Sequence, residues 1–413
     1  MSRVAIRRLS LNPSPRLARR MGAVALACAS IVLASCGGGD RESYFTPDNI
    51  VSFGDENSAI AAVPASDLNL LDNTLPIPGA SVGFKGLSYT AKAVRVDANY
   101  VCSSDPAATR VQTCGADNGQ GASFVASGSP TYHVLIDNFN LVTKYEAGTV
   151  GATASQRTTT VDYACDVAST WVQFVAHAYG RGYTSQCAQD TRGGAVSYAE
   201  LGAKTADVIN QINANRGSLG SKTVVTIMVG QNDILEQYQL IKASSQNEAG
   251  AIAVLQSRAA DMAAAVKSVI GTGAKVVLAL TPDLGQTPLA TAAGDSTLLT
   301  NLVRAYNDRL YITGLGNVSG RELAGINPES LTKPGTRSTS YQYVTPLCDA
   351  SAVLRPDGTT PANDDEKLLY CTSQYYTSGT AASTAIWADA KRAAPLLHNL
   401  IGVTVYNRGR EQF

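Results

Sequence analysis

The chain has 413 residues, enough for one large domain or two small ones, and its 45% apolar content is ordinary for a globular protein. Charged residues make up only 16%, and 33 Lys and Arg balance 33 Asp and Glu. The chain therefore has no excess positive charge that would attract nucleic acid or a strongly acidic partner, and no nucleic-acid binding is expected.

Residues 1–35 are predicted to be a targeting segment. Arginines precede a short apolar stretch over residues 21–34, which is too short to remain as a transmembrane helix. The stretch ends in Leu33-Ala34-Ser35-Cys36, which resembles the lipobox of bacterial lipoproteins. The resemblance implies a lipid anchor on Cys36, with residues 36–48 as a tether, and a location in the bacterial cell envelope at the outer membrane. The alternative is an ordinary cleaved signal peptide.

The folded domain is predicted over residues 49–405 and begins with a strand. Residues 49–53 form a short apolar run that ends in Gly-Asp, which indicates a buried strand entering a tight turn. The stretch from about 59 to 160 is rich in Gly, Ser, Thr and Ala and contains pieces in which apolar and polar residues alternate. We interpret it as a β-rich insertion.

After residue 169, helical patterns alternate with β-branched runs. Strands are predicted over residues 223–229 and 275–280. Helices are predicted over residues 171–180, 203–215, 248–270, 298–310 and 385–401. This alternation predicts an α/β fold, in which helices cover both faces of a parallel sheet.

Six cysteines remain after Cys28 and Cys36: Cys102, Cys114, Cys165, Cys187, Cys348 and Cys371. An even number in an exported protein indicates disulfides, and six cysteines allow about fifteen connectivities. Our hypothesis is nearest-neighbour pairing, 102–114, 165–187 and 348–371. The chain has no CxxC motif and only three histidines, so neither a metal nor a cofactor is expected.

Several motifs follow one another in a fixed order. They are Phe53-Gly54-Asp55, Tyr198-Ala199-Glu200-Leu201-Gly202, Gly230-Gln231-Asn232-Asp233 and Trp387-Ala388-Asp389. In this order they resemble the blocks of bacterial SGNH (GDSL-type) esterases and lipases, from about residue 50 to residue 402 without the insertion. The resemblance implies a three-layer α/β fold. It also implies an ester-hydrolysing site with an oxyanion hole from Gly202 and Asn232 and an orienting Asp389.

The two most reactive positions of that site are replaced. Glu56 stands at the nucleophile position, where a carboxylate would repel a developing oxyanion. Arg392 stands at the base position, and its pKa is too high for it to accept a proton at physiological pH. We therefore predict a non-hydrolysing protein that uses the fold for ligand binding or as a scaffold, with an ester or a carbohydrate as the possible ligand class.

Opposite charges at these two positions predict a contact between them. We expect Glu56 and Arg392 to form a buried ion pair, with Asp389 as a second partner of Arg392. One alternative is that both are exposed loop charges. Another is an active carboxylic-ester hydrolase with a rearranged site that uses Ser58 and His398, which requires the serine hydroxyl within about 2.6–3.2 Å of an imidazole nitrogen.

Overall fold

The computed structural model describes most of the chain from residue 45 onward. Side chains are described for residues 45–60, 87–92, 165, 167–187, 190–336, 338–354, 360–372 and 375–413. Between residues 80 and 163, six short strands are described by their backbone. The chain separates into two compact units, Met1–Phe45 and Thr46–Phe413, and the following concerns the second. The targeting segment and Cys36 lie outside the described residues.

A five-stranded parallel sheet forms the centre of the domain, in the order β11-β10-β9-β1-β8. The strands are β1 (Asn49–Gly54), β8 (Ala195–Ser197), β9 (Thr223–Met228), β10 (Lys275–Ala279) and β11 (Leu323–Ile326). Every residue of β9 is buried, as expected for a central strand covered on both faces. Because the strands are parallel, their carboxyl ends meet at one edge of the sheet, where ligand sites of open α/β folds form.

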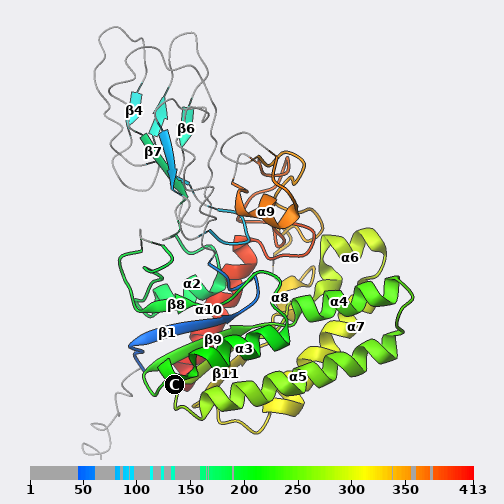
Figure 1. Cartoon of the computed structure of the whole chain (residues 1–413). Helices are drawn as coiled ribbons and strands as arrows, with labels where there is room; N and C mark the ends of the chain where they lie inside the picture. The colour runs from blue at the N-terminus through cyan, green and yellow to red at the C-terminus, as the bar shows by residue number, and fades with distance from the viewer. Residues whose placement is uncertain are drawn as a thin grey trace, which may run out of the picture. The chain divides into compact units, whose positions relative to one another are not determined.

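Helices cover both faces of this sheet (Figure 1). Helix α10 (Pro395–Gln412) packs against α2 (Trp171–Ala178) and crosses β10 and β11, whereas α3 (Thr205–Asn215) and α5 (Glu248–Ile270) pack together on the opposite face. The other helices are α4 (Gln231–Lys242), α6 (Pro288–Ala293), α7 (Ser296–Asn307), α8 (Glu329–Thr332) and α9 (Asp364–Leu369). This arrangement confirms the predicted three-layer α/β fold.

Helix α7 shows how the sequence pattern builds the core. Its buried apolar side chains are Leu299, Leu302, Val303 and Tyr306, which follow the three- and four-residue spacing of one helix face. Fully burying each aliphatic side chain stabilises the fold by roughly 1.5–3 kcal/mol. The helix continues as a π-helix over Asp308–Gly314, which also packs against α5.

The backbone of the predicted insertion forms two small sheets. One has the order β2-β7-β3, from β2 (Ala80–Gly83), β7 (Thr159–Tyr163) and β3 (Val94–Val96). The other has the order β4-β5-β6, from β4 (Gln112–Cys114), β5 (Ala122–Phe124) and β6 (Tyr132–Val134). The strand at Thr159–Tyr163 runs slightly beyond the predicted end of the insertion at residue 160.

Two of the three predicted disulfides are confirmed. Cys165 bonds to Cys187 and Cys348 bonds to Cys371. The predicted pair Cys102–Cys114 lies outside the residues whose side chains are described.

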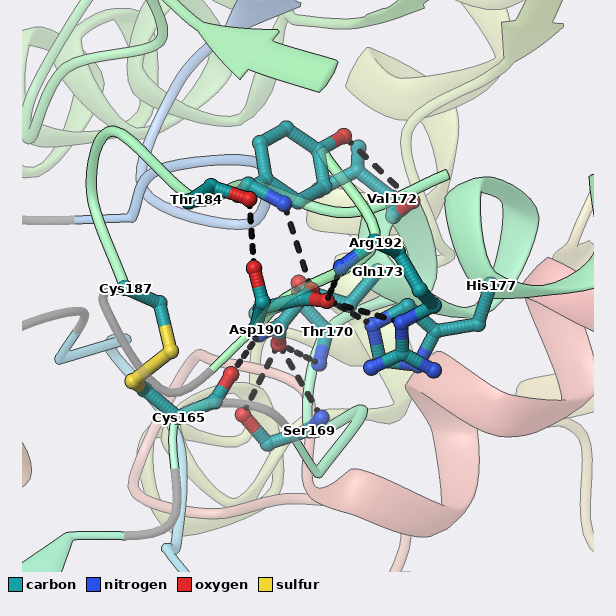
Figure 2. Close-up of polar contacts among 11 residues, drawn as sticks. Cys165, Ser169, Thr170, Val172, Gln173, His177, Thr184, Cys187, Asp190 and Arg192 are labelled. Carbon is teal, nitrogen blue, oxygen red and sulfur yellow. Dashed lines mark hydrogen bonds and ion pairs between the residues drawn. A yellow bond between two sulfur atoms is a disulfide. The ribbon is translucent and has the colours of Figure 1, made fainter. Parts of the chain in front are cut away.

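The segment after α2 is held by the buried carboxylate of Asp190 (Figure 2). This carboxylate accepts a hydrogen bond from the Tyr183 N–H and pairs with Arg192 Nε at 2.7 Å and His177 Nε2 at 3.1 Å. Burial raises the pKa of Asp190, but the hydrogen bonds from Arg192 and His177 outweigh burial and lower it. The cluster fixes the chain just before it enters the edge strand β8.

The last helix differs from its prediction. Residues 385–394 were expected to be helical, yet α10 begins at Pro395 and runs to Gln412, beyond the predicted domain end at residue 405. The Asp389 carboxylate accepts the backbone N–H groups of Lys391 and Arg392, which closes a turn there instead. Pro395 then occupies the first turn of the helix, where proline is favoured. Among the described helices, none combines the length and the apolar composition that a membrane span requires.

Candidate active site

The predicted site residues gather at the carboxyl ends of β1, β8 and β9. Strand β1 ends at Gly54, which has a φ of +152°. A Cβ at Gly54 would lie 2.3 Å from the carbonyl oxygen of Met228, so only glycine fits this close turn between neighbouring strands. The turn places Asp55 and Glu56 directly beyond the sheet edge.

The Glu56 carboxylate fills the predicted oxyanion hole. It is 2% exposed and accepts a hydrogen bond from the Gly202 N–H at 3.1 Å. It also accepts the side-chain amides of Asn232 and Gln231, each at 2.8 Å. A hydrolase would keep such donors free for the negative charge that develops in its transition state. Here the Glu56 side chain of the protein itself binds them.

The end of strand β9 positions the side-chain amides that bind Glu56. Gly230 has a φ of +124°, and a Cβ there would lie 2.6 Å from both Thr281 Oγ1 and the Tyr306 ring. Helix α4 starts directly after this glycine, so Gln231 and Asn232 occupy its first turn. Asp233 anchors the same turn, because its carboxylate accepts both the N–H and the hydroxyl of Thr205 and pairs with Arg258 at 3.0 Å.

Arg392 is 1% exposed, and its ion pairs are with residues other than Glu56. Its Nη2 contacts Asp365, its Nε lies 3.6 Å from Asp389 Oδ2, and its Cζ lies 6.0 Å from the centre of the Tyr89 ring. Burial lowers the pKa of Arg392, and the negative charge of Glu56 opposes that shift. Arginine nevertheless remains protonated, so it cannot serve as a base.

The predicted ion pair between Glu56 and Arg392 is therefore wrong in its direct form. In the part of the chain that the structure describes, these two side chains do not approach within 4.0 Å. The Gly202 N–H and two amides hold Glu56 instead, since they satisfy both carboxylate oxygens. Asp389, expected as a second partner, does contact Arg392. The alternative of two exposed loop charges is also wrong, because both side chains are buried.

Asp389 lies between the site and a neighbouring groove. Burial raises its pKa, and the charge of Glu56 adds to this effect. The groove has a volume of about 1050 Å³ and lies between α4, the 346–353 loop, α9 and the 389–391 turn. Its lining includes the apolar side chains of Leu235, Leu289 and Val353 and the charged residues Asp389 and Lys391. Such a volume is in the range of small-molecule sites.

Comparison with sequence models of protein families shows what this domain is related to. Residues 121–320 match the sequence model of the family described as "GDSL-like Lipase/Acylhydrolase". With the ordered motifs and the parallel sheet, this match identifies the family. The chain is an SGNH-type (GDSL) family member. The matched range includes Gly202 and Asn232 but stops short of both replaced positions.

Solved structures of this family resemble the chain only distantly. A lipase, Lip_vut3, from a goat rumen metagenome is 13% identical, with a TM-score of 0.30 over 48% of this chain and 83% of its own. A G-D-S-L lipolytic protein from Veillonella parvula is 12% identical, with a TM-score of 0.29 over 56% of this chain and 92% of its own. No curated protein matches the chain. Likenesses this low carry no argument about activity.

Ser58 and His398, the alternative pair for an active SGNH enzyme, do not meet. The Ser58 hydroxyl accepts the indole N–H of Trp171 at 3.1 Å, whereas His398 Nδ1 accepts the Trp171 backbone N–H at 3.3 Å. No hydrogen bond joins the two side chains within the described residues. Burial lowers the pKa of His398 to about 3, so the folded protein holds it neutral at physiological pH.

This buried histidine gives the protein a testable pH dependence. Unfolding returns His398 from a pKa of about 3 to about 6.5, so the unfolded state gains a proton as the pH falls below 6.5. This proton uptake by unfolded His398 should lower the free energy of unfolding by up to about 1.4 kcal/mol for each pH unit towards pH 4. A His398→Asn variant, which keeps an acceptor for Trp171, should lose this part of the slope in denaturant titrations between pH 4.5 and 7. An identical slope in both proteins would contradict the assignment.

Three residues that contribute to the site were not predicted from the sequence. Gln231 occupies the variable position of its motif, so nothing in the pattern indicated that it would bind Glu56. The acidic run 364–366 lies in α9 and supplies Asp365 to Arg392 from a segment that no motif marked. Lys92 is buried, donates to the carbonyls of Thr90 and Leu368, and has a pKa that burial lowers well below its usual value. Among the described residues, no cluster of metal-ligating side chains is found.

Proposed function

We propose that this protein is a non-hydrolysing SGNH-family lipoprotein of the bacterial cell envelope that uses its fold to bind a ligand. The observation that supports it is the Glu56 carboxylate, which binds both predicted oxyanion donors, Gly202 and Asn232, and the side-chain amide of Gln231 as well. A negative charge at this place opposes the development of an oxyanion, and no serine stands at the nucleophile position. Arg392 replaces the base with a group that cannot accept a proton.

Two further observations support binding as the role. The groove beside Asp389 combines aliphatic walls with charged side chains at its ends, which is the usual composition of a small-molecule site. The Cys348–Cys371 disulfide closes the segment that forms one wall, so this wall is covalently held. An ester or a carbohydrate remains the ligand class of the proposal.

A fluorophosphonate probe tests the absence of a working nucleophile. Such probes phosphonylate serines that an adjacent base activates. Intact-mass analysis of the wild-type protein should show no adduct after incubation with an excess of probe. An adduct mapped to Ser58 would overturn the proposal in favour of a rearranged active site.

Membrane attachment is tested at Cys36. We expect the full chain, expressed in a bacterium that processes lipoproteins, to begin at a lipidated Cys36 and to sediment with membranes. The Cys36→Ala variant should appear in the soluble fraction, because stable anchoring takes more than one acyl chain and this variant has none. Cys28→Ala is the matched control and should sediment like the wild type. A wild-type protein without lipid would contradict this part of the proposal.

A further inference from the structure

The guanidinium of Arg392 is only partly satisfied. Its Nη1 and Nε are buried and lack hydrogen bonds among the described residues, and Nε has only the Asp389 oxygen at 3.6 Å. Buried donors without partners cost free energy, so an acceptor for either of these two donors would stabilise the protein. A carboxylate oxygen is such an acceptor, and its hydrogen bond to a guanidinium is strengthened by charge.

Glu56 is the acidic side chain suited to become that partner. The negative charge of Glu56 acts on Arg392 and raises its pKa, although no ion pair joins the two side chains among the described residues. Its side chain has three rotatable bonds, so the carboxylate can move without a change in the backbone. In its present position it instead accepts hydrogen bonds from the Gly202 N–H and the side-chain amides of Gln231 and Asn232. We call these three donors the carboxylate hole.

The carboxylate hole lies close to solvent. Gly202 is exposed, its neighbour Leu201 is 40% exposed, and Asn232 is only partly buried. Its three converging donors already bind one carboxylate, which shows the chemistry that the hole recognises. A ligand carboxylate would accept the same three hydrogen bonds if Glu56 moved away.

We propose that the carboxylate hole binds small carboxylate ligands, and that Glu56 leaves it by swinging to the guanidinium of Arg392. The exchange keeps the three donors hydrogen-bonded, because the ligand binds the donors that Glu56 releases while Glu56 supplies an acceptor to Arg392. Ligand binding is thereby coupled to the movement of the Glu56 side chain from the carboxylate hole to Arg392. This inference rests on the proposed function, since a hydrolase would need the same hole for its transition state.

Titration with sodium butyrate tests the exchange, with sodium chloride at equal ionic strength as the reference. The wild type should show saturable binding by isothermal calorimetry or ligand-observed NMR. In Glu56→Ala the hole is already empty, so the apparent Kd should fall by about tenfold or more, because no internal carboxylate has to be displaced. Glu200→Ala, a change of an exposed acid on the same loop, is the matched control and should leave the Kd unchanged.

The partner role of Arg392 is tested separately. Arg392→Met should weaken butyrate binding by about tenfold when Glu56 is present and much less in the Glu56→Ala background. Saturable binding by Glu56→Ala but not by the wild type would overturn the exchange and make Glu56 a permanent plug. Binding by neither protein would overturn the carboxylate site. Ester hydrolysis by the wild type would instead overturn the proposed function, whatever butyrate does.

Discussion

The double variant Glu56→Ser/Arg392→His should hydrolyse short-chain nitrophenyl esters. Serine at position 56 removes the carboxylate from the oxyanion hole, so Gly202 and Asn232 become free to bind a developing oxyanion. Histidine at position 392 would lie beside Asp389, which already contacts the arginine there and could orient the imidazole. A general base typically contributes about 10²–10⁴-fold, so the double variant should exceed Glu56→Ser by roughly that factor.

The matched control is Glu56→Ser/Arg392→Gln, which opens the same hole and removes the same charge without supplying a base. It should stay near the rate of Glu56→Ser. Circular dichroism and the unfolding midpoint of each variant show whether the fold is retained. Folded double variants with equal rates would contradict the assignment of position 392 to the base.

Replacing Arg392 by alanine should lower the free energy of unfolding by about 3–5 kcal/mol. The change leaves Asp389 without its cation in a largely buried place and opens a cavity where a large side chain was fully enclosed. Asp365 is 37% exposed, so water can compensate its loss more easily. Denaturant unfolding followed by tryptophan fluorescence measures the effect.

Two variants separate charge from packing at this position. Arg392→Met refills most of the volume and should recover part of the loss, because an apolar isostere removes the unsatisfied guanidinium donors as well. The exposed Arg309→Ala is the control and should change stability by no more than about 0.5 kcal/mol. An Arg392→Ala protein as stable as the wild type would show that Arg392 is not part of the structural core.

Most of the fold could be predicted because its signals are local. The β-branched run of β9 and the alanine-rich pattern of α5 determine their elements from neighbouring residues alone. The edge strands β8 and β11 have three and four residues, too short for a period to emerge, and tertiary pairing defines them. The last helix was misplaced because the side-chain bonds of Asp389 compete with helical bonds before Pro395.

The residues of the site could be predicted from the sequence, but the contacts between them could not. Motif order located Glu56, Gly202, Asn232, Asp389 and Arg392, and the structure brings the first three together. Charge alone suggested that Glu56 would pair with Arg392. The oxyanion donors bind Glu56 instead because several hydrogen bonds to one carboxylate satisfy both of its oxygens. Asp365 comes from a distant segment that only the folded chain brings to Arg392.

The central claim is that the native site is closed to ester hydrolysis by its own glutamate. The most direct test is the initial rate of nitrophenyl butyrate hydrolysis by the purified wild-type protein, measured against buffer and against the Ser58→Ala variant. If Glu56 closes the site, the wild-type rate does not saturate with substrate and equals that of Ser58→Ala. A saturable wild-type rate, above all one that Ser58→Ala abolishes, would contradict it.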